Sequence, residues 1–108
     1  MAKQPYHRQN LAAGIAQQAR VQLENEGVAQ LSLRQIARFL AVTPAAVYRH
    51  FPDKASLLTQ LRTDIVAEIT AALREGVLDS ANAADMLQRM VANLLEYARQ
   101  HPNAVAFS

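Results

Sequence analysis

The segment VTPAAVYRHF, residues 42–51, carries the strongest structural signal in the sequence. Thr43 belongs to the residue types that cap helix N-termini, and Pro44 suits the first helical position, where its missing amide hydrogen has no partner to lose. Val42 and Val47 have the spacing of a hydrophobic staple, which fixes how the chain enters a helix. Because nucleation is costly, so short a helix is unstable alone. We therefore expect neighbouring helices to hold it.

The residues before this segment predict two such neighbours. Apolar residues recur every four positions from Leu11 to Leu23, which is one stripe of an amphipathic helix, and Gly27 ends it. Ser32 and Gln35 then have the spacing of a capping box, in which each side chain bonds the other residue's backbone amide. The apolar face of this second helix is formed by Leu33, Ile36, Ala37 and Leu40.

Two further helices are expected after Pro52. A long one ends at Gly76 and has its apolar positions at Leu57, Leu58, Leu61, Ile65, Ile69 and Leu73. A fifth helix is expected to begin near Ser80 and to be ended by Pro102, with a stripe formed by Leu87, Met90, Val91, Leu94, Leu95 and Ala98. No strand-like alternation occurs. The sequence thus predicts an all-α protein in which a three-helix bundle with a helix-turn-helix precedes a long connecting helix.

Composition excludes several classes of protein. The chain has 108 residues, 51% of them hydrophobic and 19% charged, which is ordinary globular usage. It has no cysteine, so no disulfide framework or thiolate zinc site can form, and a reducing, cytoplasmic location is expected. No segment approaches the roughly 18 apolar residues of a membrane span, and the N-terminus lacks a secretory core. Residues 1–62 carry a net charge of +5 and residues 63–108 carry −3, which favours a polyanionic partner for the first half.

The outward face of the helix over residues 44–51 has the composition of a groove-binding surface. At about 100° per residue, Val47 and Phe51 point in one direction and Arg49 points in the opposite one. Arg49 is flanked by Ala45 and Ala46 and bordered by Tyr48 and His50. Small residues permit close approach, arginine bonds a guanine edge, an alanine methyl contacts a thymine methyl, and Tyr and His can hold phosphates. Lys54 adds a cation nearby, and Ser32 and Arg34 lie in the first turn of the supporting helix, which suits a phosphate.

The segment LSLRQIARFLAVTPAAVYRHFPDKASLL, residues 31–58, resembles the signature of the tetracycline-repressor (TetR) family of bacterial transcription regulators. The matching positions are Tyr48, His50, Phe51, Lys54, Leu57 and Leu58, and the resemblance covers roughly residues 8–77. It implies a DNA-binding domain over residues 1–52, followed over residues 53–108 by the connecting helix and the start of a helical ligand-binding and dimerisation domain. Ala45 departs from the glycine frequent in the family, and the chain ends before most of the second domain, so we interpret it as a fragment.

The resemblance also implies a function. Family members usually repress transcription as homodimers on palindromic double-stranded DNA and release it when a small molecule binds. Tyr48, His50 and Lys54 would contact phosphates, while Arg34 and Arg49 are candidates for base edges. The full set of candidate DNA-binding residues is Ser32, Arg34, Thr43, Pro44, Ala45, Ala46, Tyr48, Arg49, His50 and Lys54. Dimerisation would use mainly the missing C-terminal helices, and the effector would be a small hydrophobic molecule; no other cofactor is expected.

Two alternatives remain open. Tyr48 or His50 taken singly is more often a packing or surface residue, and Arg38 fits an ordinary solvated face. A helical protein-interaction module without DNA binding would use the long helix and the apolar stripe of residues 87–98. An enzyme is the weakest alternative, because His7, His50 and His101 are scattered and neither a metal-ligand spacing nor a glycine-rich phosphate loop occurs.

Overall fold

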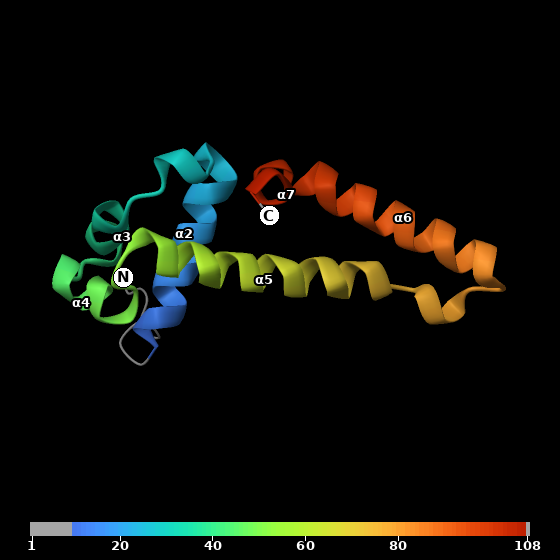
Figure 1. The fold of residues 1–108 in the computed structure, drawn as a ribbon, viewed down its shortest axis with the longest axis horizontal. Coiled ribbons are helices and arrows are strands. Elements are labelled where there is room, and N and C mark those ends of the chain that lie inside the picture. The colour runs from blue at the N-terminus through green and yellow to red at the C-terminus, as the bar shows by residue number, and fades with distance from the viewer. Residues whose placement is uncertain (1–9, 108) are drawn as a thin grey trace. The chain divides into compact units, whose positions relative to one another are not determined.

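The computed structural model describes residues 10–107, and within that range the regular structure is helical, with no strand (Figure 1). The elements are α2 (Leu11–Glu26), η1 (Val28–Gln30), α3 (Leu33–Leu40), α4 (Pro44–His50), α5 (Lys54–Arg74), η2 (Val77–Asp79), α6 (Ala83–Gln100) and α7 (Pro102–Phe107). The predicted all-α class is therefore confirmed. The chain divides into two compact units between Leu61 and Arg62, within α5. The domain boundary expected at residues 52 and 53 stays a prediction.

The first unit is built on the apolar stripes that the sequence predicts. Helices α2, α3 and α4 pack on one another. The α2 residues Ile15, Ala19 and Leu23 are completely buried, as a four-residue stripe facing the core requires. The other buried apolar residues of this unit are Leu31, Ile36, Ala37, Val47, Phe51, Leu57 and Leu61. Each of the four helices thus contributes one face to a single core.

The start of α3 differs in one respect from the expected capping box. Ser32 is the N-cap, and its Oγ accepts a hydrogen bond from Gln35 N at 3.2 Å, as predicted. The reciprocal bond, from Ser32 N to the side chain of Gln35, does not form at this described helix start. Ser32 N donates instead to Gln22 Oε1 at 3.1 Å. Gln22 is a buried polar residue of α2. Its amide therefore ties the first helix to the start of the second, and burial is compensated by the hydrogen bond.

The turn between α3 and α4 contains a left-handed residue that is not glycine. Ala41 has φ 60° and ψ 40° and forms the C-cap of α3. Its N–H donates to Arg38 O at 3.1 Å, and the N–H of Val42 donates to Ala37 O at 3.0 Å, which satisfies carbonyls at the helix end. An alanine Cβ in this conformation is strained by about 1–2 kcal/mol. The turn between α3 and α4 therefore contains backbone strain, which lowers the stability of the folded state.

In the second unit, hydrogen bonds connect α6 with the end of α5, and the two helices lie side by side (Figure 1). Asn93 Nδ2 donates to Glu75 O at 2.8 Å, and Tyr97 Oη donates to Glu68 Oε1 at 2.9 Å. Gly76, with φ 72°, begins the turn between the helices, and Arg89 donates to its carbonyl oxygen at 3.1 Å. The side chains of α6 thus anchor both the turn and the last turns of α5.

Helix α6 begins three residues later than predicted. Ser80 is the C-cap of η2, and the N-cap of α6 is Asn82, whose Oδ1 accepts from Asp85 N at 2.8 Å. Asp85 Oδ2 in turn accepts from Ala81 N at 2.9 Å, and this hydrogen bond, assisted by Arg89, lowers the pKa of the Asp85 carboxyl. Asn82 therefore caps α6 from its own side chain, and Asp85 bonds the amide of the residue before the cap, where a capping box would bond the amide of the cap itself.

The role predicted for Pro102 is confirmed, and the structure gives this residue a second role as well. Helix α6 does end before it, at Gln100, with His101 N donating to Tyr97 O at 2.8 Å. Pro102 then starts the short helix α7, which was not predicted, because proline is also suited to a first helical position. Ala104 is completely buried, and the Arg62 guanidinium lies 4.5 Å from the centroid of the Phe107 ring. A cation–π contact therefore attaches α7 to α5.

We expect Ala41→Gly to raise the free energy of unfolding by about 0.5 kcal/mol. Glycine relieves the left-handed strain, which outweighs the roughly 0.4–1 kcal/mol that it adds to the entropy of the unfolded chain. The matched control is Ala67→Gly at an exposed position inside α5, which should lower stability by about 1 kcal/mol. Urea unfolding followed by circular dichroism measures both. Equal destabilisation by the two substitutions would contradict the assignment of Ala41.

Candidate nucleic-acid interface

The orientation of α4 is set by two buried side chains. Val47 is completely buried and Phe51 is 8% exposed, so both point into the first unit's core. They are four residues apart and therefore lie on the same side of the helix. The direction predicted for the buried side of α4 is confirmed, and the opposite side faces solvent.

The exposed side of α4 carries the residues that the sequence places there. Ala45, Tyr48, Arg49 and His50 are exposed, Tyr48 at 39%, and Ala46 is half-buried at the border of the face. Arg49 thus projects from a surface whose neighbours include two methyl groups and two hydrogen-bonding rings. Such a surface permits close approach to a groove and offers donors at its centre and edges.

The N-terminus of α4 is fixed by its cap. Thr43 Oγ1 accepts a hydrogen bond from Ala46 N at 3.1 Å, and Pro44 occupies the first helical position. Both residues are exposed, whereas Val42 is half-buried. The predicted cap is confirmed. It leaves the other amides of the first turn available at the surface, where the helix dipole favours an anion.

The first turn of α3 presents Ser32 and Arg34. Ser32 is half-buried, and its hydroxyl already accepts the capping bond from Gln35 N. Arg34 is exposed. Neither Arg34 nor Arg49 forms an ion pair within residues 10–107. Since the sequence from Gly27 to Pro52 contains no Asp or Glu, these arginines face no neutralising carboxylate from their own segment.

Lys54 is half-buried at the first position of α5. Asp53, the residue before it, caps this helix. Ser56 N donates a hydrogen bond to Asp53 Oδ1 at 2.8 Å, and Asp53 N donates one to Ser56 Oγ at 3.4 Å. This reciprocal cap was not predicted from the sequence. The signal was present, because Asp-x-x-Ser after a proline has the spacing of a capping box.

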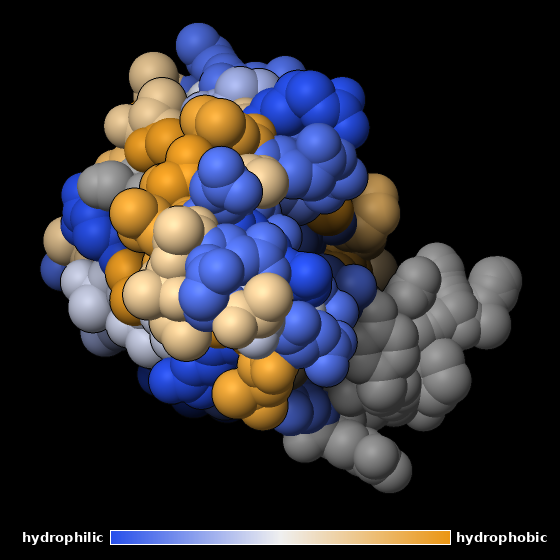
Figure 2. All heavy atoms as spheres, turned by 90° about the vertical axis from the view of Figure 1, so that its right-hand side faces the viewer, coloured by the Kyte–Doolittle hydropathy of each residue, from blue (hydrophilic) through white to orange (hydrophobic). Residues whose placement is uncertain are grey.

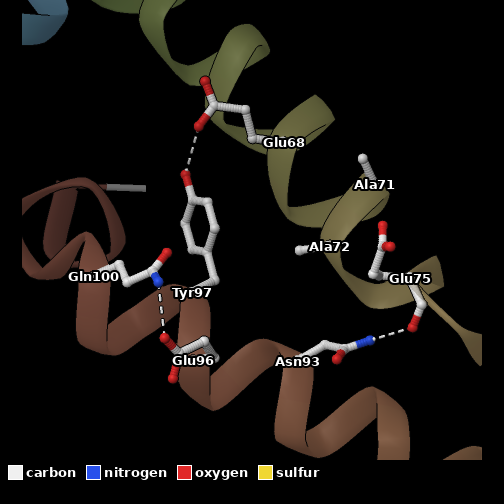
Figure 3. Close-up of a pocket in the computed structure, with 8 residues that line it drawn as sticks. All are labelled: Glu68, Ala71, Ala72, Glu75, Asn93, Glu96, Tyr97 and Gln100. Atoms are coloured by element: carbon white, nitrogen blue, oxygen red, sulfur yellow. Dashed lines mark hydrogen bonds between the residues drawn. The ribbon is translucent and has the colours of Figure 1, made fainter.

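A pocket of about 490 Å³ lies in the second unit between α5 and α6 (Figure 3). It is lined by Glu68, Ala71, Ala72, Glu75, Asn93, Glu96, Tyr97 and Gln100. The ring of Tyr97 spans it towards Glu68, and the hydrogen bond from Arg99 lowers the pKa of Glu96. The residues predicted from the sequence include none of these. The pocket thus combines apolar surface from Ala71, Ala72 and Tyr97 with three carboxylates, of which Glu68 and Glu96 already accept hydrogen bonds from the protein.

Metal and membrane chemistry find no support in the described residues. Within residues 10–107 no group of three or more His, Asp or Glu side chains is placed to hold a metal ion. Of the three histidines, His50 and His101 lie within this range, whereas His7 lies outside the described residues. None of the helices in that same range is long and apolar enough to cross a bilayer.

Helix α3, a short turn at residues 41–43 and the outward-facing α4 define a helix-turn-helix domain, the class of fold that places its second helix in the major groove of DNA. Residues 15–61 match the family of bacterial regulatory proteins named tetR, through the model of its N-terminal domain. This part of the chain is therefore a DNA-binding regulator domain of the tetR family. Regulators of this family are DNA-binding proteins and not enzymes, as expected from the sequence.

Several proteins resemble longer parts of the chain. The nucleoid occlusion factor SlmA of Aliivibrio fischeri is 26% identical over 100 residues, which cover 93% of this chain and 50% of that protein. The HTH-type transcriptional regulator Rv1816 of Mycobacterium tuberculosis is 40% identical over 62 residues, covering 57% of this chain and 26% of that protein. A protein of unknown function from Rhodococcus sp. RHA1 has a similar structure, with a TM-score of 0.84 and 33% identity over 97% of this chain and 55% of that one. The chain thus spans about half or less of these relatives.

We expect Thr43→Ala to lower the free energy of unfolding by about 1 kcal/mol, because the amide of Ala46 loses its acceptor. Thr43→Ser is the matched control: it keeps the hydroxyl and should stay within about 0.5 kcal/mol of the parent. Chemical denaturation without DNA measures both. If Thr43→Ser were as destabilised as Thr43→Ala, the hydroxyl would not be the stabilising group.

Proposed function

We propose that this chain is part of a cytoplasmic transcription regulator that binds specific DNA sequences with α4. The observation that carries the proposal is the exposed face of α4, on which Arg49 stands between Ala45 and Ala46 while Val47 fixes the helix from behind. In a major groove, Arg49 would bond a guanine edge bidentately and the alanine methyl groups would contact thymine methyls. Arg34, exposed at the start of α3, is the second candidate for a base edge.

The remaining candidates would position the domain on the DNA backbone. Tyr48 and His50 flank the outward face, and Lys54 begins the next helix, so all three are assigned to phosphates. Thr43 and Pro44 lie at the start of α4, where free amides and the helix dipole favour phosphate, and Ser32 has the equivalent place on α3. Phosphate contacts fix register without reading sequence. The domain would accordingly divide into reading residues at its centre and positioning residues around it.

The proposed regulator acts as a homodimer on a palindromic operator and represses until an effector binds. Two-fold related copies read two-fold related half-sites about one helical turn or a multiple apart, which is the usual geometry of helix-turn-helix dimers. The pocket between α5 and α6 supports the small hydrophobic effector, since Ala71, Ala72 and the ring of Tyr97 offer apolar surface there. It lies in the unit that α5 links to the DNA-binding domain.

Selection of bound sequences from random duplexes tests the proposal most directly. We expect one enriched motif containing guanine, with two-fold symmetry if the copies bind as a pair. Binding of the enriched duplex should weaken steeply with salt, because neutralised phosphates release counterions. Failure to enrich any motif, together with binding that is flat between low and physiological salt, would sink the assignment of α4.

Two substitutions should separate reading from positioning. Arg49→Ala should weaken binding to the preferred duplex by about 1–3 kcal/mol and relax the base preference at one position. Lys54→Ala should weaken all sequences similarly and reduce the salt slope by about 1, whereas Lys54→Arg should retain the slope. Arg74→Ala, at the exposed far end of α5, is the control without effect. Fluorescence polarisation on specific and scrambled duplexes measures all four, and loss of preference in Arg74→Ala would contradict the assignment.

A further inference from the structure

The two units expose different kinds of unused chemistry. In the second unit, apolar residues gather in a patch on the side formed by η2 and α6 (Figure 2), but these residues alone do not define a partner. In the described part of the first unit, the side chain of Gln22 in α2 holds a hydrogen-bond donor without an acceptor. A donor is the more informative of the two features, because it specifies the chemistry of the group that it can bind.

The orientation of the Gln22 side-chain amide is fixed by its contact with α3. Gln22 is only 9% exposed, and its Oε1 accepts a hydrogen bond from Ser32 N at 3.1 Å. Because a backbone amide can only donate, the oxygen and not the nitrogen of the Gln22 amide must face Ser32. Nε2 therefore lies on the other arm of the same planar group, with both of its hydrogens turned away from this bond.

The Nε2 donor of Gln22 is unused and accessible. Within residues 10–107, the bond from Ser32 N is the only hydrogen bond that the Gln22 side chain forms. Among the residues of this range that are not exposed, Ser80 Oγ alone is a fully buried side-chain N or O atom without a partner, so Nε2 of Gln22 reaches solvent. Buried amides normally satisfy both of their sides. A side chain that is nine-tenths buried thus holds one donor at the surface, available to an outside acceptor.

This donor lies beside the N-terminus of α3. The two heteroatoms of a side-chain amide are about 2.3 Å apart, so Nε2 lies within about 5–6 Å of Ser32 N. The first-turn amides of Leu33 and Arg34 have no acceptor inside the helix, and together with the positive end of the helix dipole they favour an anion. Gln22 therefore directs a donor from α2 towards the place where α3 favours an anion.

The charges near this donor are compatible with an anion. Residues 20–38 contain three arginines (Arg20, Arg34 and Arg38) and two glutamates (Glu24 and Glu26), which gives a net charge of +1. Glu24 is paired with Arg20 at 2.9 Å. Glu26 lies one turn beyond Gln22 at the exposed end of α2 and opposes an anion, whereas Arg34 is exposed in the first turn of α3 and attracts one. The helix dipole then leaves the balance in favour of an anion.

We propose that Gln22 is a further DNA-binding residue, whose Nε2 donates a hydrogen bond to the backbone phosphate at the start of α3 while its Oε1 holds the amide of Ser32. This inference rests on the proposed function for the identity of the anion, and it adds a residue of α2 to an interface otherwise formed by α3, α4 and the start of α5. A phosphate contact does not depend on sequence. It can therefore be tested on a duplex of any sequence, separately from the reading of bases by Arg49.

Gln22→Glu separates a phosphate contact from a purely structural role. The variant keeps an oxygen for Ser32 N and lies at the positive end of α3, so its melting temperature should stay near that of the parent. It replaces the donor by a carboxylate oxygen, so duplex binding measured by fluorescence polarisation should weaken by about 10-fold or more. Gln18→Glu, one turn earlier on α2 and half-buried, is the matched control for charge alone and should stay within about 3-fold of the parent.

The outcomes distinguish this inference from the proposed function. Equal weakening by Gln22→Glu and Gln18→Glu, or duplex binding by Gln22→Glu as tight as that of the parent, would overturn the role of Gln22 and leave the function intact. A parent chain that binds no duplex at low salt would overturn both. Enrichment of no preferred motif, with Gln22→Glu still weakening binding, would overturn sequence reading alone.

Nuclear magnetic resonance of the side-chain amides tests the contact in the unsubstituted chain, which removes any dependence on how a variant folds. In isotope-labelled protein, the NH2 signal of Gln22 is the one that Gln22→Glu lacks. Saturating duplex should shift one of its two hydrogens, whereas inorganic phosphate at the concentration of the duplex phosphates should leave both unchanged. An unchanged signal in the saturated complex would overturn the proposal. An equal shift with inorganic phosphate would assign the donor to a free anion and overturn its assignment to DNA.

Discussion

The burial of Val47 in the core of the first unit controls where the rest of α4 points. A seven-residue helix is too short to persist alone, so its conformation and direction depend on the partners of its buried side. Complete burial of one valine and near-complete burial of Phe51 each contribute about 1.5–3 kcal/mol. Once these two side chains are fixed, the helical repeat leaves Arg49 facing solvent. The presented surface is therefore a consequence of the core behind it.

Most of this first unit follows from short-range rules. The stripe containing Ile15, Ala19 and Leu23 and the caps at Ser32 and Thr43 depend on residues three or four positions apart, and the sequence displays such spacings directly. The partner of the Ser32 amide could not be predicted in this way. Gln22 reaches it from ten residues upstream, and this contact exists only because α2 and α3 pack together. Local spacing cannot reveal a bond that depends on tertiary packing.

Pro102 and the α5–α6 pocket show the same limit in the second unit. Proline is compatible both with the end of one helix and with the start of another, and what decides between them is the burial of Ala104 and the contact of Phe107 with Arg62. The pocket depends on Tyr97 meeting Glu68, which is 29 residues away. For the outward face of α4, by contrast, exposure could be predicted from the helical period alone. The assignment of exposed residues to bases or to phosphates stays a prediction. The helical period shows in which direction a side chain points, but it does not show what that side chain binds.

The two halves of the chain carry net charges of opposite sign, and this matters if two copies pair on DNA. Bringing together two copies also brings together two N-terminal halves of charge +5, whose repulsion opposes association. DNA neutralises that charge, so a duplex with two half-sites would stabilise the proposed pair. Because a ligand that binds the pair better than the single copy shifts the association by mass action, self-association and operator binding would strengthen each other. A weak interface between copies would then be sufficient, because copies that are largely separate in solution would be joined where two half-sites lie at the right spacing.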